Sequence, residues 1–131
     1  MQLKFVLVDG DDAWRVAPQL KESGVPVILG PATSLPPRRD DDYDSGWSSA
    51  AKLQQAGVKF CIASSGRSAE TNERNVGYEA GLASGYGLPK EEALKAVTLY
   101  PAQILGVADK LGSLETGKAA TLIVTNGDPL D

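Results

Sequence analysis

The chain has 131 residues, 42% of them hydrophobic, and carries a formal net charge of −4, which suits one compact domain with a core of ordinary size. Its Lys and Arg residues are scattered, so nothing indicates nucleic-acid binding, and no run of about 18 apolar residues predicts a membrane span. The start lacks the pattern of a signal peptide, so we expect a cytoplasmic protein if Met1 is the natural start.

The first third of the chain predicts a strand, a helix and a second strand. The apolar run Leu3–Val8 is typical of a strand that stops at Asp9-Gly10. Apolar residues near helical spacing predict a helix over about Ala13–Ser23, which Gly24 ends. A second strand is expected over Val25–Leu29.

The middle of the chain repeats this order after a long loop. Residues 30–46 are rich in proline, aspartate and glycine, and loops of that length are usually functional or mobile. A helix from Trp47 to about Ala56 and a strand over Val58–Ala63 follow. The polar stretch Ser64–Asn72 predicts another loop, and a helix is expected from about Glu73 to Tyr86.

The last third predicts two helices, a turn and a strand. One helix carries the apolar face of Ala93–Val97, and a second, short helix ends at Gly106. A glycine-bracketed turn over Gly112–Lys118 precedes Ala120–Val124, which has the pattern of a buried strand. The alternation of strands and helices along the whole chain predicts an α/β fold with three parallel βα units and right-handed crossovers.

Several blocks of the sequence resemble the amidohydrolase superfamily, and its imidazolonepropionase-like members in particular. The most specific are Ala93–Thr98, Tyr100–Gly106 and Gly112–Lys118. Further blocks are Gly24–Pro31, Ala56–Phe60 and Asn75–Gly81, so the resemblance covers nearly the whole chain.

The resemblance implies part of a metal-dependent (β/α)8 barrel. The chain is too short for a complete barrel of roughly 250 residues, so we expect a partial (half) TIM-type barrel, equivalent to strands six to eight, over residues 1–108. Residues 109–131 would be the carboxyl-terminal helical and β extension, with the return segment of the composite β-sandwich. The family typically holds zinc or another divalent metal, through a histidine at the end of strand six and an aspartate at the end of strand eight.

This sequence departs from that pattern, because it contains no histidine. The end of strand six holds Asp9, and the end of strand eight holds Ser64 and Ser65. By position these three are the catalytic candidates, although a neutral serine hydroxyl cannot accept a proton as a carboxylate does. We therefore expect no metal site and no cofactor in this chain alone. Asp11, Arg67 and Asn75 are the candidates for substrate binding.

Other patterns have simpler interpretations. Ser64-Ser65-Gly66 has no histidine as a base, and the single cysteine, Cys61, lies in an apolar run typical of a core residue. The G-x-x-x-x-G-K pattern at Gly112–Lys118 precedes a predicted strand rather than a helix, so a turn is favoured over a phosphate loop.

The acidic loops leave a further alternative open. The spacing in Asp40–Gly46 fails the EF-hand pattern and favours a solvated loop in which Asp44 or Ser45 caps the next helix. Asp11 and Asp12 have the same capping role before the first helix. Since loops that follow parallel strands share one face, their carboxylates would gather oxygen ligands of the kind that Mg²⁺ or Ca²⁺ prefers.

Two classes of function remain. The first is an amidohydrolase-type protein or fragment that hydrolyses C–N bonds in amides, cyclic amides or peptides in the full-length context, with the isolated chain inactive. The second is a non-catalytic binding or assembly module on the same scaffold. Because a half barrel leaves open sheet edges, we expect partners: another copy or the missing amino-terminal half-barrel, along with a small-molecule ligand.

Overall fold

A computed structural model describes residues 4–33, 35–36, 38–64 and 73–130 of the chain. Three short strands, β1 (Leu7–Val8), β2 (Val27–Leu29) and β3 (Phe60–Ile62), form a parallel sheet in the order β1-β2-β3. Leu7 pairs with Val27, and Ile28 pairs with Cys61. This confirms the predicted α/β fold with three parallel strands.

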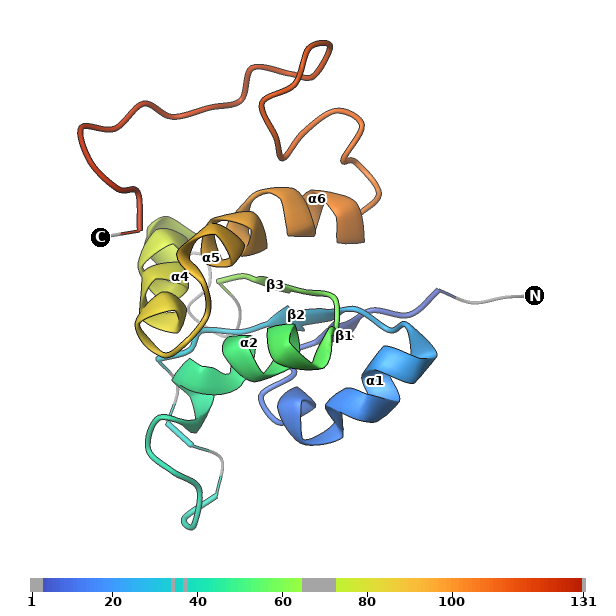
Figure 1. Cartoon of the computed structure of the whole chain (residues 1–131), viewed down its shortest axis with the longest axis vertical. Helices are drawn as coiled ribbons and strands as arrows, with labels where there is room; N and C mark the ends of the chain where they lie inside the picture. Colours follow the sequence, from blue (N-terminus) through green and yellow to red (C-terminus); the bar gives the residue numbers. More distant parts are fainter. Residues whose placement is uncertain (1–3, 34, 37, 65–72, 131) are drawn as a thin grey trace.

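The helices surround this sheet. The chain forms a 3₁₀ turn η1 (Ala13–Val16), α1 (Ala17–Ser23), α2 (Ser45–Ala56), a second 3₁₀ turn η2 (Glu73–Asn75), α4 (Val76–Gly85), α5 (Lys90–Val97) and α6 (Leu99–Ile104). In Figure 1, α1 and α2 lie beneath the strands, while α5 and α6 lie above β3. Within the described residues, no helix has the length and apolar character needed to cross a bilayer.

Two predicted helix ends are confirmed by the backbone. Gly24 and Gly57 follow α1 and α2 with left-handed φ values of 66° and 73°, which glycine adopts without steric cost. The predicted starts were less accurate. Helix α2 begins at Ser45, two residues before Trp47, and Asp44 precedes it without donating or accepting a capping side-chain hydrogen bond.

The core lies between the sheet and the helices. Phe60, Leu53, Leu88 and Val27 are its largest fully buried side chains, and small residues of α2, α4 and α5 let these helices approach closely. Cys61 is 2% exposed, and burial raises the pKa of its thiol to about 11, so it is a neutral core residue at pH 7. By contrast, β1 is exposed at the edge of the sheet.

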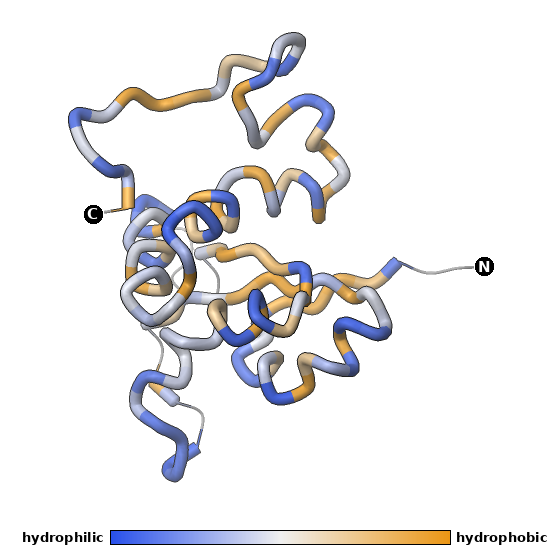
Figure 2. The backbone as a smooth tube through the Cα atoms, in the orientation of Figure 1, coloured by the Kyte–Doolittle hydropathy of each residue, from blue (hydrophilic) through white to orange (hydrophobic). Residues whose placement is uncertain are grey.

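The predicted buried strand over Ala120–Val124 is wrong. These residues form no strand, and Ile123 and Val124 are 78% and 90% exposed. Figure 2 shows their apolar stretch in an arm that leaves the body of the molecule after α6. An apolar segment becomes a strand only when a second strand pairs with it, and no described part of the chain lies beside this one.

The arm returns to the body at its far end, where Pro129 and Leu130 lie against α4 (Figure 1). Leu130 is buried in the core, and its backbone N–H donates to the Asp128 carboxylate at 2.9 Å. Lys90 forms an ion pair with Asp128 at 2.6 Å. We call residues 128–130 the terminal clasp, because they fix the end of the arm to α4 and α5.

Candidate functional site at the carboxyl edge of the sheet

The carboxyl ends of the three strands point to one edge of the sheet, where the candidate residues were expected. Asp9 follows β1 with a φ of 55°, a left-handed conformation that few residues other than glycine adopt. Aspartate tolerates it better than most residues, and here the Asp9 N–H still donates to the Ile28 carbonyl at 3.1 Å. The chain therefore turns sharply at Asp9, directly after the strand ends.

Four charged side chains join the loop after β1 to the loop after β2. Arg38 donates to both carboxylate oxygens of Asp12, at 2.9 and 2.7 Å, and Arg15 donates to the same carboxylate at 3.0 Å. Arg15 also binds Asp41, whose side chain is almost fully buried. The two arginines balance the two aspartates, so we call this group the loop ion-pair network.

The loop ion-pair network corrects the predicted capping role of Asp12. Asp12 precedes η1 but makes no capping side-chain hydrogen bond. Instead, the hydrogen bonds from Arg38, followed by those from Arg15, hold the pKa of its carboxyl below the usual range. Its oxygens are occupied by guanidinium groups.

Asp11 has the opposite electrostatic environment. Partial burial, and then the nearby carboxylates of Asp9 and Asp12, raise the pKa of Asp11 above its ordinary value. A carboxyl group whose charged form is disfavoured by its surroundings is a common feature of functional sites, although structural clusters produce it as well.

Replacing Asp11 by Asn tests this environment. The pKa of Asp11 is higher in the folded protein than in the unfolded chain, where it is 3.8. The contribution of Asp11 to stability is therefore fully present below pH 3.8 and is lost as the pH rises through the pKa of the folded protein. At pH 7 we expect Asp11→Asn to increase the free energy of unfolding slightly, by up to about 0.5 kcal/mol, and the gain should vanish below pH 3.8. Urea unfolding at several pH values measures both effects.

Asp12→Asn is the matched control, since its pKa shift has the opposite sign. We expect that variant to be less stable than the parent at pH 7 and equal to it once the parent's Asp12 is protonated. If both variants changed stability in the same direction, the assignment of opposite environments would be wrong.

Glu79 is a site residue that the sequence did not reveal. It lies on α4 with 7% exposure, and its carboxylate accepts hydrogen bonds from the Ala32 N–H at 2.8 Å and the Thr33 hydroxyl at 3.0 Å. Ala32 and Thr33 belong to the long loop after β2. Glu79 therefore fixes that loop to α4 across 47 positions of sequence.

The sequence-predicted site residues are only partly brought together. Asp9 and Asp11 follow β1, and Ser64 follows β3, so these three lie at the predicted edge. Asn75 ends η2 just before α4 and is half-buried. Ser65 and Arg67 lie outside the described residues.

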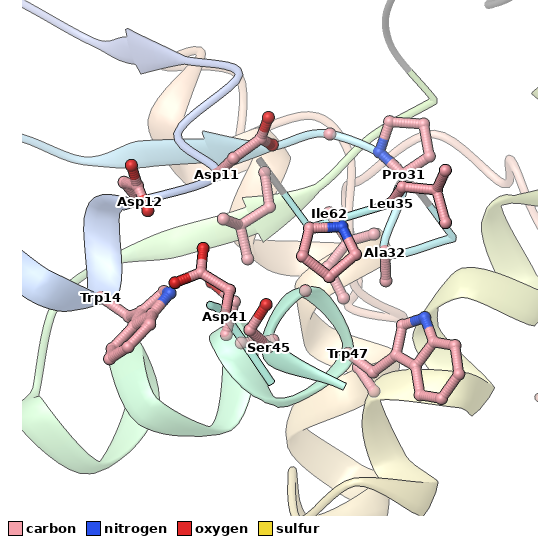
Figure 3. A pocket seen from close by; sticks show the side chains of 17 residues that line it. Asp11, Asp12, Trp14, Pro31, Ala32, Leu35, Asp41, Ser45, Trp47 and Ile62 are labelled. Atoms are coloured by element: carbon pink, nitrogen blue, oxygen red, sulfur yellow. The ribbon is translucent and has the colours of Figure 1, made fainter. Parts of the chain in front are cut away.

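A small pocket opens at this edge, as Figure 3 shows. Residues of the loop after β1, the loop after β2 and the first turns of α2 line it, and Leu29 and Ile62 add apolar side chains to the lining. Its volume is about 40 Å³. Of the predicted site residues, Asp11 is in its lining, whereas Asp9 and Ser64 are not.

Comparison with known proteins decides the family. The model of the amidohydrolase family matches residues 4–131 of the chain. The chain belongs to the amidohydrolase family. The resemblance inferred from the sequence blocks is thereby confirmed.

Solved structures and curated relatives of the amidohydrolase family agree with this. An amidohydrolase from Thermotoga maritima superposes with a TM-score of 0.80 at 32% identity, covering 96% of this chain and 32% of that one. An adenosine deaminase from Xanthomonas campestris with bound zinc gives a TM-score of 0.64 at 25% identity, covering 88% of this chain and 27% of that one.

Among curated proteins, the imidazolonepropionase of Syntrophobacter fumaroxidans is 32% identical over 109 residues, which is 82% of this chain. The N-acetylglucosamine-6-phosphate deacetylase of Haemophilus influenzae is 49% identical over 37 residues, 28% of this chain and 10% of its own length. The chain spans about a quarter of the imidazolonepropionase.

The metal that the amidohydrolase fold implies does not fit the described residues by themselves. The sequence has no histidine, and among residues 4–33, 35–36, 38–64 and 73–130 no three metal-ligating side chains lie close enough to hold an ion. Asp12 and Asp41 are bound by arginines instead. The alternative of an Mg²⁺ or Ca²⁺ site on the loop face therefore gains no support from the part of the chain that is described.

Proposed function

We propose that this chain is the carboxyl-terminal part of an amidohydrolase-type enzyme that hydrolyses C–N bonds in amides, cyclic amides or peptides. The observation that carries the proposal is the family match over residues 4–131 in a chain that spans only about a quarter of a curated relative. The parallel βα units would then be the half-barrel equivalent to strands six to eight. The remaining strands would come from polypeptide outside these residues.

In this proposal the chain supplies the strand-end groups and the loops that face the substrate. Asp9 is the carboxylate directly at the end of β1, and it is the group there able to accept or return a proton, whereas Ser64 and Ser65 offer neutral hydroxyls. Asp11, Arg67 and Asn75 remain the proposed substrate contacts. Metal ligands would come from the other part of the barrel, since those described here do not form a set.

The proposal predicts that the isolated 131-residue chain neither hydrolyses amides nor retains stoichiometric zinc. Elemental analysis after incubation with zinc and removal of excess metal would measure the second property, and release of amine from acyl amides and cyclic amides the first. Co-expression with the amino-terminal half-barrel of a homologous amidohydrolase should restore both. One zinc ion per isolated chain, with turnover, would refute the proposal that the metal ligands come from the other half of the barrel.

A partner at the open sheet edge is part of the same proposal. Val6 and Val8 are exposed on and beside β1, and Val8 is 54% exposed. The N–H groups of Leu7 and Asp9 donate to the carbonyls of Pro26 and Ile28, so the alternate backbone groups of Val6 and Val8 are directed to the open edge. We propose that another copy, or the missing half-barrel, covers this edge.

Light scattering checks whether copies associate. We expect a mass above 13.7 kDa at about 10 μM, and we expect Val8→Lys to shift the population toward monomer because edge lysines oppose strand pairing. Lys4→Glu, outside β1, serves as a charge-change control. If the parent chain is a monomer at this concentration, a second copy is not the partner, and the missing half-barrel remains the proposed partner.

The alternative function is a non-catalytic binding or assembly module. The complete absence of histidine from the 131 residues is the observation that favours it. The co-expression experiment separates the two, because a module of this kind would associate with a half-barrel partner or with itself without gaining zinc or turnover.

A further inference from the structure

Ser49 has an unsatisfied hydroxyl in the wall of the small pocket. It lies near the start of α2 with 3% exposure, and its Oγ has no hydrogen-bond partner within the described residues. The neighbouring Ser48 differs, since its hydroxyl donates to the Asp44 carbonyl at 3.1 Å and it does not line the pocket. A buried hydroxyl without a protein partner opposes folding, so a group in the pocket that accepts a hydrogen bond from Ser49 would be stabilising.

The first turn of α2 adds donors to the same wall. Gly46 and Trp47 line the pocket, and as first-turn residues of a 12-residue helix their N–H groups have no acceptor inside the helix. The N–H groups of Ser45 and Ser48 donate to the carbonyls of Asp42 and Asp44, whereas the N–H groups of Gly46 and Trp47 donate to no backbone carbonyl of the described residues. The unmet requirement of this wall is therefore an acceptor atom.

The charges around the pocket narrow the chemistry of that acceptor. Asp11, Asp12 and Asp41 all line it. Among the described residues Arg15 and Arg38 pair with Asp12 and Asp41 but not with Asp11, so the Asp11 carboxylate remains to repel an anion. A cation is opposed by the partial positive charge of the helix start and offers no acceptor. A neutral carbonyl group provides an acceptor atom and carries no net charge, so it suits both the donors of the wall and the charges around the pocket.

The volume and the apolar lining of the pocket limit the size of the ligand and the kind of group beside its carbonyl. About 40 Å³ is room for roughly three water-sized positions, which limits the enclosed part of a ligand to roughly three non-hydrogen atoms. Leu29, Ile62, Ala50 and Ala83 provide apolar contact for a methyl or methylene group.

We propose that this pocket binds the primary amide group of a small neutral ligand, with the Ser49 hydroxyl and the first-turn N–H groups of α2 donating to its carbonyl oxygen. The amide N–H₂ then faces the rim, where Asp11 accepts. The site shares Asp11 with the proposed substrate contacts, but neither Asp9 nor Ser64, the proposed strand-end groups, lines the pocket. Ligand binding to the isolated chain can therefore be measured apart from hydrolysis.

Three isosteric probes of different charge test the chemistry: acetamide, acetate and acetamidinium. Two-dimensional NMR of the full 131-residue chain would follow the amide signals of Gly46, Trp47 and Ala50 during titration. We expect saturable shifts with acetamide, with a Kd on the order of 10 mM, and at least about fivefold weaker binding of the two charged probes. Equal or tighter binding of acetate or acetamidinium, or no saturation with acetamide, would overturn the proposal.

Matched serine variants test the residue. Ser49→Ala should weaken acetamide binding by about two- to tenfold, the range expected for loss of one hydrogen bond, and should raise the melting temperature because the unsatisfied hydroxyl is gone. Ser48→Ala, one residue away and outside the pocket, should leave acetamide affinity unchanged. Unchanged affinity in a folded Ser49→Ala protein, or equal losses in both variants, would show that Ser49 does not bind the ligand.

Discussion

Gly81→Ala is expected to detach the terminal clasp from α4. A Cβ at position 81 would lie 2.0 Å from the Leu130 carbonyl oxygen and 3.2 Å from its carbonyl carbon, so either the helix or the clasp must move. Because the clasp lies at the end of the chain, it is the part that yields, and the buried Leu130 side chain is then exposed. Burial of a leucine side chain contributes about 1.5–3 kcal/mol.

The net change in stability is smaller than that figure. Alanine in place of glycine in a helix adds up to about 1 kcal/mol, so we expect Gly81→Ala to lower the free energy of unfolding by about 1–2 kcal/mol. Urea unfolding measures the loss, and the methyl signals of Leu130 should move toward values typical of a solvent-exposed leucine.

Gly85→Ala is the matched control on the same helix. A Cβ at position 85 would meet no other part of the described chain within 4 Å, so this variant should gain about 0.5–1 kcal/mol from helix propensity alone. The same substitution at two positions four residues apart is thus expected to lower the free energy of unfolding at position 81 and to raise it at position 85. If both variants were stabilised equally, the contact between Leu130 and α4 would not exist in solution.

The local order of strands and helices was predictable because it depends on short-range patterns. Apolar runs beside Asp9-Gly10 and before the loop at residue 30 located β1 and β2, and Gly24 and Gly57 located two helix ends. These signals are local: a short apolar run of strand character, and a glycine that adopts positive φ without a Cβ clash.

The features that were missed depend on contacts between distant parts of the chain. A single glutamate on a helix, such as Glu79, is usually solvated, and nothing in the sequence says that Ala32 will donate to it. The glycines at positions 77 and 81 did carry a signal, since two glycines four apart leave a flat strip on one face of a helix, but the sequence does not say what covers it.

The exposed arm illustrates the opposite error. Thr121–Val124 has the composition of a strand, yet pairing needs a second strand, and the described chain provides none beside it. The composition correctly indicates that the segment favours a strand, but without a neighbouring strand the segment stays irregular. The domain boundary between residues 108 and 109 stays a prediction for the same reason, because it concerns a β-sandwich that other polypeptide would complete.

Removing the Glu79 carboxylate is expected to loosen the loop after β2 and to cost more stability than the other single substitutions considered. Glu79→Ala would leave the partly buried Ala32 N–H without its acceptor and remove the partner of the Thr33 hydroxyl. Hydrogen bonds to charged groups contribute about 1.5–3 kcal/mol each, and part of this is offset by no longer burying a carboxylate, so we expect a loss of about 2–3 kcal/mol. Urea unfolding and hydrogen exchange at Ala32, which should become faster, are the measurements.

Two further variants separate hydrogen bonding from general effects of charge. Glu79→Gln keeps one acceptor oxygen but replaces the other with an N–H₂ group, which then faces another hydrogen-bond donor. The stability of this variant should therefore lie between that of the parent and that of Glu79→Ala. Glu91→Ala removes an exposed carboxylate paired with Lys95 at 2.8 Å and should change stability by less than about 0.5 kcal/mol. Because the loop held by Glu79 also carries Arg38 and Asp41, release of Ala32 should disturb the loop ion-pair network, whereas Glu91→Ala should not. A Glu79→Ala protein as stable as Glu91→Ala, with unchanged exchange at Ala32, would mean that the candidate site is positioned without Glu79.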